Sequence, residues 1–263
     1  GSSVGYAMCG GRVIVELMYA DFIGCAGDEI FNQVAKWQSM SAGILKMPII
    51  IRVSVGSKYG AQHSQDWTAL TAHIPGLKVV FPASPYDAKG LMNAALNGTD
   101  PVIFFESQRI YDIGEQFHKG GVPEGFYTVE FGDPDVKIEG KDITILSIDA
   151  VLYRVLDAVK ELKEKYGMEA EIIDARTLVP FDSEAIFASV RKTGRCVVVS
   201  QCVDIGSFTG EIVSQVVANC FDDLDAPVLK IGAKNGIAPQ AYTLEEAFLP
   251  TAADIVAAVK KLY

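Results

Sequence analysis

Apolar residues along the chain fall into two patterns: short unbroken runs, and longer stretches in which they recur at helical spacing. In the first half, apolar runs of strand length lie at residues 12–18, 48–53, 79–81 and 102–106. Helical spacing is found over residues 22–39, and a second helical stretch begins at Ser84. Strand-length runs separated by helical stretches predict strand–helix–strand units, because parallel strands need crossover connections.

The same alternation resumes in the second half. We expect strands at residues 143–148, 170–173, 196–200 and 228–231, and helices at residues 151–166, 183–192, 208–220 and 252–262. The stretch 112–140 is rich in glycine and charged residues, which is typical of a segment that crosses between domains. The pattern therefore predicts an α/β protein of two consecutive domains with mainly parallel sheets, at residues 1–125 and 141–263.

Two local motifs predict where helices begin. Ser84 suits the N-cap position of a helix, Pro85 suits the first helical position, and Asp87 suits the positively polarised first turn. Thr251 and Asp254 resemble a capping box in which Asp replaces the usual Glu. We therefore expect one helix to start at Ser84 and the last helix to start at Thr251.

Composition narrows the class of protein. Hydrophobic residues make up 49% of the 263 residues, which is enough for a sizeable core and excludes disorder of the whole chain. The longest apolar run, at 47–51, is far shorter than the roughly 20 residues of a membrane span. The 23 Lys and Arg against 33 Asp and Glu give a net charge of −10, which repels nucleic-acid phosphates. We therefore expect neither a membrane nor a nucleic acid as partner.

Cysteine usage favours a reducing compartment. The five cysteines are an odd number without a C-x-x-C pair or metal-ligand spacing, and three of them lie in apolar contexts typical of buried thiols. We therefore expect a cytoplasmic protein. No targeting segment is visible, and because the chain opens at Gly1-Ser2-Ser3 without an initiator Met, we expect the amino end of the first domain to be incomplete.

Common catalytic motifs are absent from the sequence. It contains no G-x-G-x-x-G after a strand, no phosphate-binding P-loop, no G-x-S-x-G elbow and no H-E-x-x-H. The three histidines, His63, His73 and His118, are too far apart in sequence to form a metal-ligand motif. If the chain is catalytic, a cofactor or a partner supplies much of the reactivity.

The segment at residues 56–67, GSKYGAQHSQDW, is the strongest candidate for a site, because it follows a strongly apolar strand. Ligands of parallel sheets bind at the carboxyl ends of the strands, and a histidine there can exchange a proton near neutral pH. The alternative is that Ser64 caps the next helix and His63 satisfies a buried carbonyl group. We expect His73 to lie at a helix end and His118 to be solvated.

A second candidate lies at residues 19–22, where another strand gives way to a helix. Tyr19 and Phe22 would flank the same sheet edge, where an aromatic face can stack on a flat ligand ring. Packing in the core is the alternative for Phe22. Asp21 is explained without function if it caps the following helix.

Several segments together resemble one family. They are ELMYADF at 16–22, DEIFNQVAKWQSMSAG at 28–43, PIIIR at 48–52, GAQHSQDW at 60–67, HIPGLKVVFPASPYDAKGL at 73–91, DPVIFFES at 100–107, IIDARTLVPFD at 172–182 and LDAPV at 224–228. Over essentially the whole chain and in order, they resemble the beta subunit of the thiamine-diphosphate-dependent first component of 2-oxo acid dehydrogenase complexes. This resemblance implies a pyrimidine-binding domain followed by a transketolase C-terminal-like domain.

The resemblance also implies an activity. A beta subunit of this family contributes to the oxidative decarboxylation of a 2-oxo acid, here pyruvate first, with acyl transfer to the lipoamide of an acyltransferase core. Acetoin dehydrogenase and other split thiamine-dependent transferases are a second interpretation. A non-catalytic transketolase-like scaffold is a third, favoured if the natural chain has no catalytic glutamate upstream of Gly1, where the resemblance places that residue.

Site residues follow from the same resemblance. Phe22 matches the aromatic residue that stacks on the aminopyrimidine ring of thiamine diphosphate, and Tyr19 and Gln62 belong to the same cofactor site. His63 matches the active-site histidine that orients or protonates intermediates during transfer to the lipoyl group.

The remaining ligands and partners are implied in the same way. An alpha subunit holds the diphosphate and its magnesium ion, and it forms a heterotetramer with two beta subunits. A structural potassium ion is held by positions that match Ile49, Ala95, Leu96, Gly98 and Asp100, where Gly98 replaces an acidic residue of one well-known member. The acidic surface suits a basic docking module of the lipoyl acyltransferase.

Overall fold

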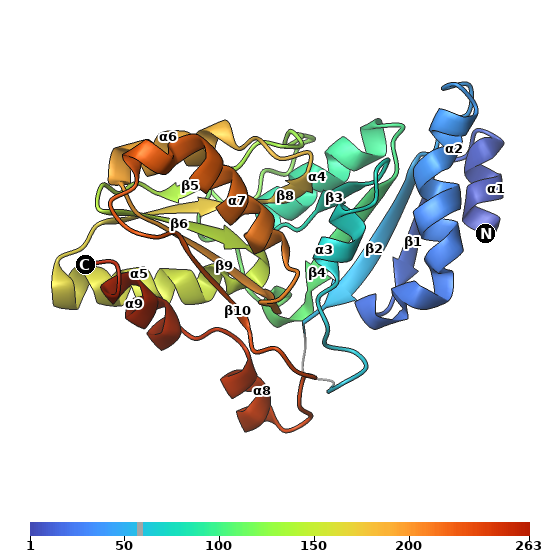
Figure 1. The fold of residues 1–263 in the computed structure, drawn as a ribbon. Coiled ribbons are helices and arrows are strands. Elements are labelled where there is room, and N and C mark those ends of the chain that lie inside the picture. The colour runs from blue at the N-terminus through green and yellow to red at the C-terminus, as the bar shows by residue number, and fades with distance from the viewer. Residues whose placement is uncertain (57–59) are drawn as a thin grey trace. The chain divides into compact units, whose positions relative to one another are not determined.

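The computed structural model describes residues 1–56 and 60–263, which form two compact units (Figure 1). The first unit comprises residues 1–132 together with 177–180, and the second comprises residues 133–176 together with 181–263. Each unit contains one five-stranded, mainly parallel sheet with helical crossovers, as the alternating apolar pattern predicts.

The sheet of the first unit has the strand order β1-β2-β4-β3-β8. Its strands are β1 (Val13–Leu17), β2 (Ile49–Val55), β3 (Lys78–Val80), β4 (Val102–Ser107) and β8 (Thr177–Val179). All neighbours are parallel except β8, which pairs antiparallel with β3 at one edge. The sequence pattern misses β8, which forms by pairing with the open edge of β3.

Helices of the first unit cover this sheet, and one of them, α4, begins at a side-chain cap. They are α1 (Ser2–Met8), α2 (Ala35–Met40), α3 (Thr68–Ala72) and α4 (Pro85–Asn97). As predicted, the Ser84 hydroxyl accepts a hydrogen bond from the amide of Asp87, at 3.2 Å. Leu91 and Ala95 of α4 are buried and pack with Phe104 of β4 in one apolar cluster.

The segment predicted as a helix at 22–39 is helical from Ala20 to Met40, but it is not one regular α-helix. The segment divides into a 3₁₀-helix at Ala20–Ala26, a π-helix at Glu29–Val34 and then α2. Gly24 and Gly27 weaken an α-helix at its start, because glycine loses the most backbone entropy on ordering. Gly76 lies beside this segment with φ +100°, and a Cβ there would meet the carbonyl oxygen of Ala35 at 2.0 Å.

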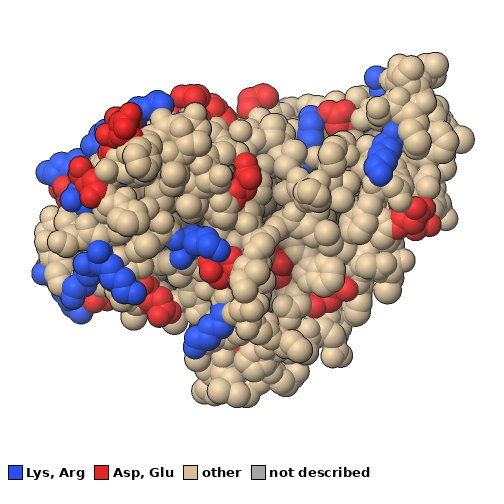
Figure 2. Space-filling view, viewed as in Figure 1, with Lys and Arg blue, Asp and Glu red and all other residues tan. Residues whose placement is uncertain are grey.

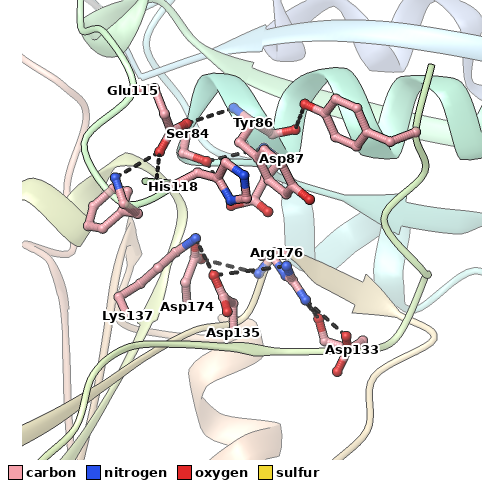
Figure 3. Close-up of polar contacts among 12 residues, drawn as sticks. Ser84, Tyr86, Asp87, Glu115, His118, Asp133, Asp135, Lys137, Asp174 and Arg176 are labelled. Carbon is pink, nitrogen blue, oxygen red and sulfur yellow. Dashed lines mark hydrogen bonds and ion pairs between the residues drawn. The ribbon is translucent and has the colours of Figure 1, made fainter. Parts of the chain in front are cut away.

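His118 is exposed, as the sequence predicts, and its ring also makes a contact that the sequence does not predict. Its ring stacks on Tyr86 of α4 with centroids 4.0 Å apart (Figure 3). The ring of Tyr127 also stacks on Tyr86, at 4.6 Å. Glu115 accepts hydrogen bonds from the amides of Tyr86 and His118, at 2.8 and 2.9 Å. The charged segment after β4 is therefore held against the start of α4.

The second unit has the strand order β10-β9-β6-β7-β5. Its strands are β5 (Asp135–Ile138), β6 (Ile143–Ile148), β7 (Ala170–Asp174), β9 (Cys196–Val203) and β10 (Leu229–Ala233). Its helices are α5 (Leu152–Tyr166), α6 (Glu184–Thr193), α7 (Phe208–Cys220), α8 (Tyr242–Phe248) and α9 (Ala252–Lys260). Only β5 is antiparallel. Helices α5 and α9 cover one face of the sheet, and α6 and α7 cover the other (Figure 1). The predicted capping box of Thr251 and Asp254 is confirmed.

A charged network fixes the edge of the second unit (Figure 3). Lys137 of β5 has a side chain only 2% exposed and forms ion pairs with Asp135 at 2.6 Å and with Asp174 at 3.8 Å. Arg176 donates from Nε and Nη2 to the carbonyl oxygen of Asp133, at 2.9 and 2.5 Å, and Nη2 lies 3.2 Å from the Asp133 carboxylate. These bonds tie the start of β5 to the chain that leaves β7.

Charged side chains of both signs are interspersed on the face shown in Figure 2, and wide uncharged areas separate them. The surplus of acidic residues is therefore not gathered into one continuous field on that face. Among the described residues, no helix is both long and apolar enough to cross a bilayer.

Arg176 provides a test of the network. Replacing it by Met keeps the apolar stem but removes the charge-assisted bonds to Asp133, so unfolding of the second unit is expected to cost about 2–3 kcal/mol less. Urea unfolding followed by circular dichroism measures this change. The matched control is Arg191→Met. The ion pairs of Arg191 are 3.8 Å long, so this substitution is expected to lower the free energy of unfolding by no more than about 0.5 kcal/mol. Equal effects of the two substitutions would contradict the stabilising role of the network.

Candidate active site

The residues predicted at the end of the first strand lie at the carboxyl end of β1. Tyr19 is the N-cap residue of the 3₁₀-helix that follows, and Phe22 lies in its first turn. The centroids of the two rings are 6.4 Å apart in an edge-to-face arrangement. Phe22 is 38% exposed, so its ring is not packed in the core, which was the alternative considered from sequence.

The loop that carries His63 follows the neighbouring strand β2. Residues 57–59 of the predicted segment lie outside the described residues, and the chain is described again from Gly60. The ring of His63 lies 4.4 Å from that of Tyr19 and 5.4 Å from that of Phe22, measured between centroids. The structure thus brings together three of the predicted site residues, which come from two loops far apart in sequence.

Asp21 connects the two loops. It does not cap the helix, because the 3₁₀-helix has no side-chain cap; its carboxylate instead accepts a hydrogen bond from the amide of Gln65, at 3.3 Å. Burial raises the pKa of the Asp21 carboxyl above its ordinary value, and the bond from Gln65 and the nearby His63 oppose that shift. A half-buried carboxylate therefore lies beside the predicted catalytic histidine.

Gln62, the remaining predicted cofactor residue, lies exposed in the turn immediately before His63. At the start of the helix after the loop, the Asp66 carboxylate accepts from the amide and the hydroxyl of Thr68, at 3.0 and 2.6 Å. Asp66 therefore supports the start of this helix, which is a structural role for one residue of the polar segment.

A cavity of about 440 Å³ in the first unit is lined by other residues than the predicted ones. Arg52 of β2 and Glu106 of β4 form a bidentate ion pair on its wall, at 2.6 and 2.7 Å, and the Tyr111 hydroxyl donates to Glu106 at 2.9 Å. Burial and then the Glu106 charge raise the pKa of Tyr111 to about 12. Sequence reasoning missed this pair, although Arg52 and Glu106 each interrupt an apolar run.

The positions predicted for a potassium ion lie at residue 49 on β2, in the last turn of α4, and in the loop between α4 and β4. Ile49 is fully buried in β2. Ala95 and Leu96 belong to the last turn of α4, and Gly98 is its C-cap residue. The Asp100 carboxylate lies 2.8 Å from the ammonium of Lys78 and 3.0 Å from the amide of Gln38.

Two family comparisons match the two halves of the chain. Residues 1–113 match the transketolase pyrimidine-binding domain family, and residues 132–255 match the transketolase C-terminal domain family. Among solved structures, a split-gene transketolase described as an inactive beta4 tetramer superposes with a TM-score of 0.76 at 27% identity, covering 100% of this chain and 79% of that one.

Curated relatives carry three kinds of name. The chain is 42% identical to the acetoin:2,6-dichlorophenolindophenol oxidoreductase subunit beta of Cupriavidus necator, covering 99% of this chain and 76% of the relative. It is 38% identical to the 2-oxoisovalerate dehydrogenase subunit beta of Bacillus subtilis, covering 100% and 80%. It is 42% identical to the mitochondrial pyruvate dehydrogenase E1 component subunit beta of Caenorhabditis elegans, covering 99% and 74%.

The bond between Asp21 and Gln65 is testable without any ligand. Asp21→Ala removes the acceptor, so hydrogen exchange of the Gln65 amide is expected to accelerate about 10- to 150-fold, the equivalent of one hydrogen bond to a charged group. Asp21→Asn keeps an oxygen acceptor and should retain most of the protection. An unchanged exchange rate of that amide in Asp21→Ala would show that the bond does not hold the loop.

Proposed function

Because the chain belongs to the family of beta subunits in which a transketolase pyrimidine-binding domain precedes a transketolase C-terminal domain, we propose that it is the beta subunit of a thiamine-diphosphate-dependent 2-oxo acid dehydrogenase. It contributes to oxidative decarboxylation of a 2-oxo acid and to transfer of the acyl unit to a lipoyl group. The observation that carries this proposal is the cluster of Tyr19, Phe22 and His63 at the carboxyl edge of β1 and β2.

The residues of this cluster fit half of a thiamine diphosphate site. A flat aminopyrimidine needs an aromatic face that is not already covered, and the partly exposed ring of Phe22 offers one at a strand end. Phe22 therefore stacks on the pyrimidine in this proposal, with Tyr19 and Gln62 beside it. When bound, thiamine diphosphate supplies the carbanion stabilisation that breaks a bond next to a carbonyl group.

His63 is the proton-transfer group of the proposed site. An imidazole changes its charge near neutral pH, so it can give or take a proton at a ring nitrogen during acyl transfer. Tyr19 and Phe22 limit the orientations of its ring, and the Asp21 carboxylate lies close to it. In this proposal His63 orients the lipoyl acceptor and supplies it with a proton.

The proposal includes an alpha partner that holds the diphosphate and its magnesium ion. The described residues contain no cluster of three or more His, Cys, Asp or Glu side chains that could hold a metal. The split-gene transketolase that resembles this chain is described as inactive in its beta4 form, which supports a requirement for a second kind of subunit. Two alpha and two beta subunits then form the complete enzyme, which docks on a lipoyl acyltransferase.

Acetoin is the second candidate substrate, because two relatives named for acetoin are as similar as those named for pyruvate. Cleavage next to the carbonyl group of either compound leaves an acetyl unit, whereas 2-oxoisovalerate leaves a branched one. Rates with the three substrates, measured by dye reduction on the reconstituted alpha–beta pair, distinguish them. Activity with none of the three would favour the non-catalytic scaffold instead.

Dependence on the partner is a direct prediction. The full-length beta chain alone should reduce no dye in the presence of thiamine diphosphate, magnesium and substrate, and addition of the alpha subunit should restore the reaction, because each subunit carries half of the site. Dye reduction measures both states. Full activity of the beta chain alone would contradict the split site.

His63→Ala and Phe22→Ala should fail in different ways. His63→Ala is expected to lower kcat for acyl transfer to lipoamide about 10²- to 10⁴-fold. Thiamine diphosphate binding, measured by isothermal titration into the alpha–beta pair, should stay unchanged. Phe22→Ala removes the stacking surface and should weaken that binding about tenfold. The matched control is His73→Ala at the C-terminal end of α3, which should retain full activity. Acyl transfer at the wild-type rate by His63→Ala would exclude the proposed role.

A further inference from the structure

The backbone carbonyl groups at the C-terminal end of α4 carry partial negative charge and can contact a cation. They belong to the last helical turn and its cap, where carbonyl oxygens lack helical partners and the helix dipole is negative. Two of the positions predicted for potassium, Leu96 and Gly98, contribute such carbonyls. A positive group that contacts these carbonyls would connect the end of α4 to the element that carries it.

A positive group from this chain already contacts these oxygens. Nη1 of Arg12 donates to the carbonyl oxygen of Leu96 at 2.7 Å and to that of Gly98 at 2.5 Å. The guanidinium is always charged and carries several donors, so it supplies both the charge and the directed contacts that carbonyl oxygens require. One nitrogen atom thus bridges two of the predicted metal ligands.

The other predicted ligands are also engaged. The carbonyl oxygen of Ala95 accepts a hydrogen bond from the Gly98 amide, at 3.3 Å. The Asp100 carboxylate is held by the Lys78 ammonium at 2.8 Å and by the Gln38 amide at 3.0 Å. Gly98 offers no side chain. A metal ion here would have to displace a guanidinium and share its surroundings with Lys78, so the residues present do not fit a bound potassium ion.

We propose that the guanidinium of Arg12 takes the place of the structural monovalent cation in this protein. Arg12 lies immediately before β1, whose first residue, Val13, pairs with Ile49 of β2. The same loop also accepts from the amide that precedes β2, because Met47 donates to the carbonyl oxygen of Thr99 at 3.1 Å. Arg12 therefore anchors the start of β1 to the end of α4 and the loop that follows it, through hydrogen bonds from its charged guanidinium. The first unit then needs no potassium ion at this place.

This inference is independent of the proposed function, and its test needs no activity. Thermal unfolding of the full-length protein is measured in potassium chloride and in tetramethylammonium chloride at equal ionic strength, and bound alkali metal is quantified by mass spectrometry after desalting. The wild-type midpoint is expected to be the same in both salts, with no stoichiometric potassium. A higher midpoint in potassium with one bound ion per chain would overturn the proposal.

Substitution of Arg12 gives the second half of the test. Arg12→Ala should lower the midpoint by about 2–4 °C in tetramethylammonium, because two charge-assisted bonds are lost. Any stabilisation by potassium should appear in this variant, where the carbonyl oxygens are no longer occupied. The matched control is Arg109→Ala, which removes an arginine bond to the carbonyl of Gly56 and should create no response to potassium. A midpoint of Arg12→Ala equal to the wild type in both salts would also overturn the proposal.

Discussion

The parallel pairing of β1 with β2 is the constraint on which the candidate site depends. The register runs from Val13 opposite Ile49 to Leu17 opposite Val53, so both strands end at the same edge of the sheet. Residues more than forty positions apart in sequence, Tyr19 and His63, consequently meet with ring centroids 4.4 Å apart. A shift of this register by one residue would exchange the faces of β1 and separate the two loops.

Pairing alone does not fix the orientation of the loops, and the local structure after β1 supplies the rest. The 3₁₀-helix after β1 is more tightly wound than an α-helix, so its side chains point in different directions from those of a regular α-helix. In that turn Phe22 stays partly exposed, and the Asp21 carboxylate reaches the Gln65 amide of the other loop. The departure from ideal helix geometry and the proposed function therefore occur in the same few residues, as is common for irregular helical turns.

The sequence predicts the elements that depend on neighbouring residues and misses those that depend on distant ones. The apolar run that becomes β2 and the capping box at Thr251 are visible locally, and both form as expected. The edge strands β5 and β8 are only four and three residues long and exist because β7 and β3 offer open edges, which no local pattern reveals. The stacking of His118 on Tyr86 is missed for the same reason, since Tyr86 lies on a different element.

The contacts of Arg12 show how far a resemblance in sequence can define a site. A ligand set made of backbone carbonyls is nearly independent of side-chain identity, so matching positions preserve the oxygen atoms without specifying what binds them. What binds is decided by the charges that the rest of the fold brings near, here Arg12 and Lys78. An exchangeable ion would link stability to its concentration in solution, whereas a tethered guanidinium has no such linkage. The same carbonyl oxygens can therefore serve either kind of cation, and the residue that precedes β1 determines which one they hold.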